Sequence, residues 1–146
     1  MNPISALRPV RLEFGGMDAE RLRRLYDSAA ADFERMPDLV DEIVDPDIEF
    51  VTRDGRQRGQ AAFRSYNEGW ALPREKTLVE RISVDDVIDA GEGKFVVLLT
   101  VRRGNEEGEY LNAWPAHVWR FEGDKAMYFE GHVNRAEALK AVGLTG

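Results

Sequence analysis

Apolar side chains recur at helical spacing in the first half of the chain and at strand spacing in the second half. Asp18 is a good N-cap, and the apolar stripe that follows it predicts a first helix. Pro37 is expected to end that helix, and a short second helix is expected over 38–44. A third helix is predicted over 60–71. The stripe of the first helix consists of Leu22, Leu25, Tyr26, Ala29 and Phe33.

The other apolar positions alternate with polar ones or form short runs that glycine interrupts. A short strand over 48–52 is expected before the turn at Asp54-Gly55. Four later strands have short, glycine-bearing connections, which predicts an antiparallel meander, and Asn134 is placed to cap a final helix. The order of elements indicates an α+β fold with helices on one face of a sheet. The four strands are expected over 77–89, 94–103, 109–121 and 126–133.

Composition limits the class of protein. A chain of 146 residues fits one domain with one core, and we expect an irregular arm over 1–17 followed by a single domain over 18–146. The formal net charge of −7 disfavours nucleic acid and anionic membrane surfaces as partners. The absence of cysteine excludes disulfides and thiolate catalysis. No secretory signal or membrane span is visible, so we expect a cytoplasmic protein.

Short segments spread over about residues 18–144 carry a family likeness: Asp45–Phe50, Arg58-Gly59, Asp89–Gly91, Ala116–Phe121, and Arg135–Leu139 with Gly143-Leu144. They resemble the nuclear transport factor 2-like fold, and specifically its SnoaL-like branch of polyketide cyclase and ketosteroid isomerase-like proteins. The resemblance implies a cone formed by a curved antiparallel sheet, with helices packed on its concave face around an apolar pocket.

The resemblance also implies a hydrophobic small-molecule ligand, no cofactor, and a homodimer formed through the outer face of the sheet. It leaves the activity open, because the family includes isomerases, cyclases, hydrolases and proteins that are not enzymes. No phosphate-binding loop or dinucleotide fingerprint is present. His117, His132 and Glu130 could imitate a metal-binding set, but adjacent strands often produce such triples by chance, so no metal is expected.

Both histidines lie on the hairpin that turns at Gly123-Asp124. A regular two-residue turn would place His117 opposite Glu130, with Trp119 opposite Tyr128 and Pro115 opposite His132, all on one face. That face either lines the pocket or forms the dimer surface. The resemblance favours the pocket, because steroid isomerases carry a pocket acid at the position of His117, whereas hydrophobicity favours the opposite face as core.

His117 is the first candidate for acid–base chemistry, with Glu130 as the carboxylate that orients it. Tyr26 is the second, because steroid isomerases carry on this helix a tyrosine that donates to a developing oxyanion. His132 could bind substrate or carry a proton. Each also has a purely structural interpretation, as a paired histidine, a core tyrosine or an aromatic substitute. The expected substrate-binding residues are Trp70, Trp119, Phe50, Phe63, Tyr128 and Asn134.

The sequence departs from the family at the usual base. The position of the steroid isomerase carboxylate is occupied by Phe50, and Asn134 stands where SnoaL-type cyclases carry an aspartate. Our leading hypothesis is acid–base catalysis of the isomerase, cyclase or hydrolase type on an apolar, oxygen-bearing ligand. The alternatives are a carrier or sensor of a hydrophobic molecule, which the missing base favours, and a dimeric interaction module with a filled interior.

Overall fold

The computed structural model describes residues 16–71, 77–105 and 110–144. Most of the expected arm, residues 1–15, lies outside the described residues, as do the expected strand start at Glu109 and the side chain of Trp70. The helices of the described part are α1 (Ala19–Ala31), the 3₁₀ turn η2 (Phe33–Arg35), α2 (Met36–Asp41), α3 (Gln60–Ala71) and α4 (Arg135–Ala141).

The first helix begins as the sequence predicts, but the second begins at Met36, two residues earlier than expected. The Asp18 side chain accepts a hydrogen bond of 2.7 Å from the backbone of Arg21 and caps α1. Pro37 lies in the first turn of α2 and does not end α1, which stops at Ala31. Proline suits the first turn because the N–H it lacks would have no partner there. Val44, expected in the second helix, instead begins β1 and pairs with Ala126.

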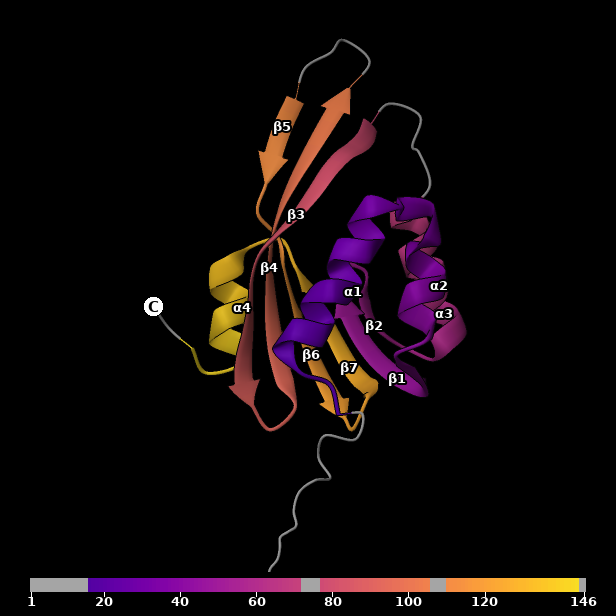
Figure 1. Ribbon diagram of the computed structural model, residues 1–146, viewed down its shortest axis with the longest axis vertical. Coiled ribbons are helices and arrows are strands. Elements are labelled where there is room, and N and C mark those ends of the chain that lie inside the picture. The colour runs from indigo at the N-terminus through magenta and orange to yellow at the C-terminus, as the bar shows by residue number, and fades with distance from the viewer. Residues whose placement is uncertain (1–15, 72–76, 106–109, 145–146) are drawn as a thin grey trace, which may run out of the picture.

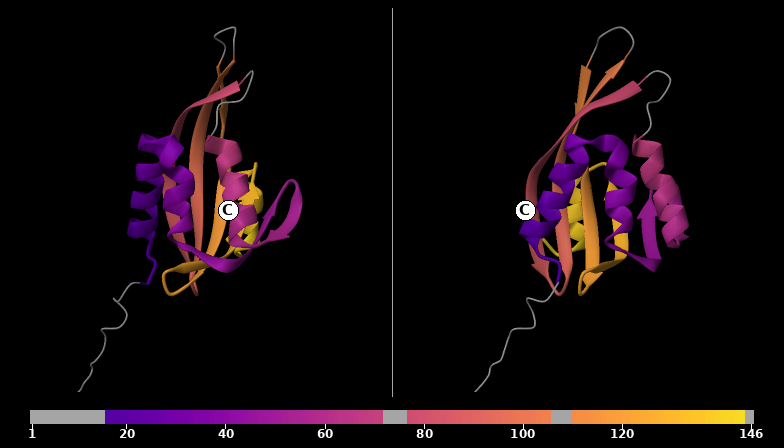
Figure 2. Two further views of the ribbon diagram at one scale, coloured as in Figure 1. Left: turned by 90° about the vertical axis from the view of Figure 1, so that its right-hand side faces the viewer. Right: turned by 45° about the vertical axis from the view of Figure 1, so that its right-hand side comes forward.

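Within the described residues the sheet has seven strands in the order β2-β1-β7-β6-β4-β3, with β5 paired to β4 as well. It is mixed, because β1 runs parallel to β7, so the expectation of a wholly antiparallel sheet was wrong at this pair. The far ends of β3 and β4, with β5, extend beyond the helices (Figure 1 and Figure 2). The strands are β1 (Val44–Thr52), β2 (Gly55–Arg58), β3 (Thr77–Gly91), β4 (Lys94–Asn105), β5 (Tyr110–Ala113), β6 (Ala116–Glu122) and β7 (Lys125–His132).

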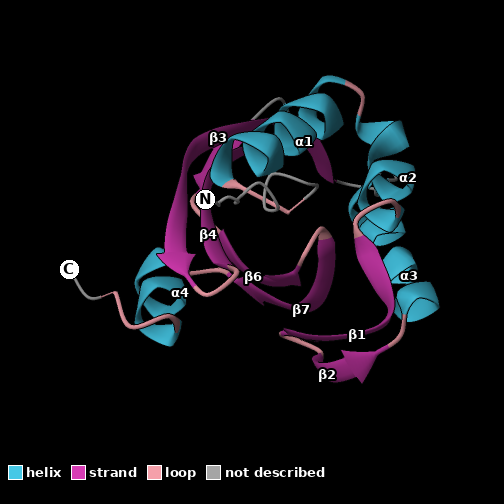
Figure 3. Cartoon of the chain, turned by 60° about the horizontal axis from the view of Figure 1, so that its bottom comes forward, coloured by secondary structure: helices cyan, strands magenta, loops and turns pink. Residues whose placement is uncertain are grey.

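The sheet curls around one side of the molecule, and α1, α2 and α3 lie across its concave side (Figure 3). The fourth helix, α4, lies on the outer side, so not all helices pack on the concave face as expected. A separate small cluster holds it there, in which Ala138 packs with Val96, Ala116 and Val118 from β4 and β6. In the described residues, no helix has the length and apolar character needed to cross a membrane.

The strand expected over 109–121 is two strands, β5 and β6, which both pair with β4. The break falls at Trp114-Pro115, where the proline has no N–H to contribute to a sheet. The Pro115 carbonyl still accepts a 3.0 Å hydrogen bond from Leu99, so the chain stays against β4 while it changes direction.

The register of β6 and β7 differs from the prediction by one residue. Glu122 pairs with Lys125 as expected, but a bulge at Met127 shifts the remaining pairs, so that His117 lies opposite Gly131 and not Glu130. Since side chains alternate between faces, one extra residue moves each later side chain of β7 to the other face. Phe129 therefore joins His117 on the concave face. The outer face receives Tyr128, Glu130 and His132.

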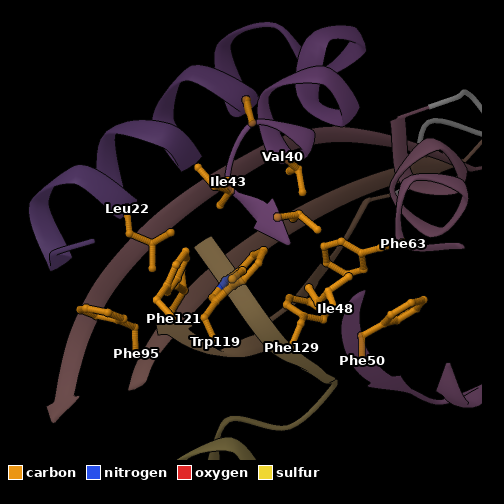
Figure 4. Packing of buried hydrophobic residues seen from close by; sticks show 14 of the residues in the cluster. Leu22, Val40, Ile43, Ile48, Phe50, Phe63, Phe95, Trp119, Phe121 and Phe129 are labelled. Atoms are coloured by element: carbon orange, nitrogen blue, oxygen red, sulfur yellow. The ribbon is translucent and has the colours of Figure 1, made fainter. Parts of the chain in front are cut away.

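The main core lies between the concave face and the three helices. Aromatic rings dominate it, with Phe63 of α3 packed edge-on against Trp119 and tilted against Phe129. Figure 4 shows these rings with Leu22, Val40 and the other labelled side chains converging from helices and strands. This packing fixes the walls of a cavity between the sheet and the helices.

Gly93, in the β3–β4 turn, should not tolerate a side chain. An added Cβ would lie 2.3 Å from the carbonyl oxygen of Phe121, and the residue has a φ of +78°. Gly123 also has a positive φ but has open space around it. A substitution there therefore measures the cost of the backbone conformation without the cost of the steric clash. We expect Gly93→Ala to lower the free energy of unfolding by roughly 2 kcal/mol more than Gly123→Ala does, measured by urea denaturation. Equal losses would mean that the turn moves away from β6 without cost.

Candidate functional site

A cavity lies between the concave face of the sheet and helices α1, α2 and α3. The space open to the centres of water molecules is about 70 Å³. That volume holds roughly five to seven waters, and so a ligand on the order of ten non-hydrogen atoms. The walls are largely apolar, with side chains that include Leu25, Phe33, Met36, Val101 and Phe129.

One chain of hydrogen bonds crosses this apolar space. The indole Nε1 of Trp119 donates to the hydroxyl of Tyr26 over 2.7 Å. The same hydroxyl lies 2.5 Å from Nδ1 of His117. Trp119 is fully buried, His117 is half-buried, and all three side chains line the cavity. The helix α1 thus supplies the central hydroxyl, and β6 supplies both ends of the chain.

The donors and acceptors in this chain can be assigned. An indole N–H can only donate, so the Tyr26 oxygen accepts from Trp119. If the phenol then donates to Nδ1, one polar group remains without a partner in the described residues, the N–H at Nε2 of His117. If Nδ1 donates instead, both the phenol hydrogen and a bare Nε2 remain. Unpaired buried polar groups are costly, and O–H donors make the shorter contacts. We therefore assign the proton of His117 to Nε2.

The environment keeps this site uncharged. Burial lowers the pKa of His117 from 6.5 to about 4, and the charge of His132 adds to the effect. Burial also raises the pKa of Tyr26 above its usual value, although the bond from Trp119 opposes the shift. At neutral pH the cavity therefore contains a neutral imidazole and a neutral phenol.

Three of the predicted site residues lie together on the outer face, away from the cavity. Glu130 accepts a hydrogen bond from the hydroxyl of Tyr128 and lies 2.7 Å from Nε2 of His132. The prediction that Glu130 orients His117 was wrong, because the bulge at Met127 turns the carboxylate outward. The Tyr128 hydroxyl has a pKa raised to about 12, by burial and by Glu130.

Three other predicted residues, Phe50, Phe63 and Asn134, have contacts in the core or at a helix cap and not in the cavity. Phe50 and Phe63 are fully buried in the core, 4.9 Å apart between ring centroids, and neither lines the cavity. Asn134 caps α4 by accepting from the backbone of Ala136 and Glu137. The side chain of Trp70 lies outside the described residues.

The cavity also contains polar residues that the sequence did not single out, Tyr66 and Asn67 of α3. Asparagine in the middle of a helix is unfavourable, because its amide competes with the backbone, and that was the available signal for Asn67. For Tyr66, the related feature is Gly131, which pairs with His117. A Cβ at Gly131 would lie 3.1 Å from the Tyr66 hydroxyl, so the glycine leaves room for the tyrosine side chain. In the part of the chain that the structure describes, no three His, Asp or Glu side chains are placed to share a metal ion.

Solved structures share this architecture. An NTF2-like protein of unknown function from Burkholderia pseudomallei is 24% identical over 82% of this chain and 95% of its own, with a TM-score of 0.59. A protein from Mesorhizobium loti described as a candidate SnoaL-like polyketide cyclase is 13% identical, over 80% of this chain and 99% of its own, with a TM-score of 0.60. TerC co-crystallised with polyporic acid is 16% identical, over 82% and 95%, with a TM-score of 0.58.

No protein-family model matches the chain, and no curated protein matches it. The structural likeness, at these identities, establishes the fold. The chain has the α+β cone of nuclear transport factor 2-like proteins, the fold that SnoaL-like and ketosteroid isomerase-like proteins share, as the sequence motifs predicted. The fold does not specify the chemistry, which depends on the side chains in the cavity.

The tautomer of His117 can be tested directly. We expect NMR of the imidazole nitrogens to find a proton on Nε2 and a bare Nδ1 at neutral pH. The chain has only two histidines, so the spectrum of His117→Gln completes the assignment. A protonated Nδ1 would reverse the direction of the Tyr26 hydrogen bond.

Acid should destabilise the protein through His117. Because the pKa falls from 6.5 in the unfolded chain to about 4 in the folded one, the unfolded chain binds the extra proton between these values. Stability is therefore lost as the pH falls through this window. Relative to His117→Gln, the wild type should lose about 3 kcal/mol of unfolding free energy between pH 7 and about pH 4. Parallel pH profiles for the two proteins, from urea denaturation, would contradict the shift.

Proposed function

We propose that the protein binds an apolar, oxygen-bearing small molecule in this cavity and that His117 donates a hydrogen bond from Nε2 to its oxygen. The observation that carries the proposal is the chain from Trp119 through Tyr26 to His117, which ends in a largely apolar space. A donor held in a dry site stabilises negative charge on an oxygen more strongly than water does.

The chemistry that fits best is the acid side of acid–base catalysis, in an isomerase, cyclase or hydrolase. A neutral imidazole can polarise a carbonyl oxygen without first becoming charged. In this scheme Tyr26 positions His117 and does not itself donate to the ligand, because its only hydrogen is directed to Nδ1. Tyr26 thereby takes the orienting role that the sequence had assigned to Glu130.

A second candidate is a carrier or sensor that binds such a molecule without changing it. In the described residues, no aspartate or glutamate lines the cavity, and His117 with its Nδ1 engaged is a poor base. Proton abstraction would thus depend on water or on the substrate itself. Both candidates use the same cavity and the same donor, and they differ only in turnover.

We propose a homodimer through the outer face of the sheet, where α4 covers β4 and β6 but leaves exposed polar side chains on β1 and β2, including Glu49 paired with Arg58 over 2.7 Å. We also propose a cytoplasmic location. The complex of TerC with polyporic acid supports small-molecule binding as a use of this fold.

Acetophenone, whose carbonyl lies on a ring of suitable size, tests the proposed donor. With the carbonyl carbon isotopically labelled, its NMR resonance should move to higher frequency on binding, because a hydrogen bond withdraws electron density from the carbon. We expect His117→Phe to bind the ketone without this shift. Tyr128→Phe, on the outer face, is the matched control and should retain it. The same shift in His117→Phe would remove His117 from the proposal.

The same ketone separates the enzyme from the carrier. In heavy water, polarisation of the carbonyl should speed deuterium exchange at the methyl group. An enzyme of the proposed kind should exceed the buffer rate by at least about tenfold, and His117→Phe should abolish most of the excess. Exchange at the buffer rate, with the carbonyl shift still present, would favour the carrier.

A further inference from the structure

The cavity contains an acceptor that the hydrogen-bond chain of His117 does not use. Asn67 of α3 is only 7% exposed, and it lines the cavity. Its amide nitrogen donates to the backbone carbonyl of Phe63, one helical turn earlier, over 3.0 Å. That bond fixes the orientation of the planar amide, because the nitrogen must face the helix. The carbonyl oxygen, Oδ1, therefore faces away from this bond.

Within the described residues, Oδ1 of Asn67 has no hydrogen-bond partner. Oδ1 is not one of the side-chain polar atoms that are both fully enclosed and unpaired, so part of its surface is accessible. The small exposed fraction of Asn67 thus includes Oδ1, and the cavity is the space that the residue lines. A buried acceptor without a partner is costly, so such an atom calls for a donor.

Helix packing alone does not account for an asparagine here. The Phe63 carbonyl is four residues before Asn67, and so it is already the normal partner of the backbone N–H of residue 67. Leucine has the same branched arrangement of heavy atoms as asparagine and would suit an apolar wall and a helix better. The amide is unfavourable for the helix and for the wall, and its useful feature is an oriented acceptor.

We propose that Asn67 recognises a hydroxyl or N–H group of the ligand through Oδ1. The inference rests on the proposed function, in which His117 binds an oxygen of the same molecule. Together the two residues define a ligand with an acceptor at one position and a donor at another, on a compact apolar frame. A hydroxylated ring ketone of roughly ten non-hydrogen atoms has these features and suits the volume of the cavity.

The ligand is neutral. A carboxylate or phosphate would face the carbonyl oxygen of Asn67 and the neutral imidazole of His117, and no lysine or arginine among the described residues lines the cavity to offset its charge. A cation would find no carboxylate among the described residues that line the cavity. Transfer of an unpaired charge into an apolar site is far more costly than transfer of a hydroxyl that finds a partner.

Two sets of probes test the two groups separately by isothermal titration calorimetry. Acetophenone is compared with its meta- and para-hydroxy derivatives, and ethylbenzene is compared with para-ethylphenol. In the wild type, at least one hydroxyl should raise the affinity about threefold to tenfold, the usual value of one hydrogen bond. Asn67→Leu should remove that gain, so that each hydroxylated probe binds no more tightly than its parent compound. His117→Phe should keep the gain for para-ethylphenol over ethylbenzene.

Ser65→Ala is the matched control, because Ser65 lies on the exposed side of the same helix, and it should bind every probe as the wild type does. Asn67→Ala serves as a second variant if Asn67→Leu does not fold. If acetophenone binds but no hydroxyl improves affinity, or if the gain survives in the Asn67 variants, the inference is wrong and the proposed function stands. If acetophenone does not bind, the proposed function fails. The ethyl pair then decides the role of Asn67 alone: a gain that Asn67→Leu removes supports it, and any other result overturns it.

Discussion

The need to pair polar groups in a largely apolar interior governs this site. The Tyr26 hydroxyl is useful there because it can accept from one neighbour and donate to another, and so it joins Trp119 to His117. Because the phenol hydroxyl is hydrogen-bonded on both sides, the N–H at Nε2 of His117 is left for a ligand. The apolar walls strengthen that remaining donor, because a low local dielectric increases every electrostatic interaction in the cavity. The chemistry of the site follows from this one accounting of donors and acceptors.

The sequence predicted the architecture well because strong local signals coincide with it. The helical spacing from Leu22 to Ala29, the N-caps Asp18 and Asn134, and the glycine turns each fix an element from its own neighbourhood. The parallel pairing of β1 with β7 was beyond such reasoning, because it joins segments about eighty residues apart. Pro37 was expected to end the first helix, but α1 already stops at Ala31 and the proline lies in the first turn of α2, a position that suits it.

The candidate site was predicted only in part, and a single residue explains much of the difference. The bulge at Met127 leaves no mark in the alternation of apolar and polar residues, yet it exchanges the faces of the following side chains of β7. Glu130 consequently lies outside the cavity, and Phe129 lies inside it. Asn67 was missed for another reason: a polar residue next to an apolar stripe is usually solvated, and only the packed structure reveals an amide almost wholly enclosed.

The outer helix α4 has a consequence for how such a protein can change. Strands β4 and β6 carry two interleaved rows of side chains: Val97, Leu99 and Trp119 face the main core, while Val96 and Val118 meet α4 in a cluster of their own. Substitutions in the two rows share few neighbours, and their effects on stability should largely add. The chain can therefore remodel its exterior, and with it any surface for association, while the chamber keeps its ligand preference.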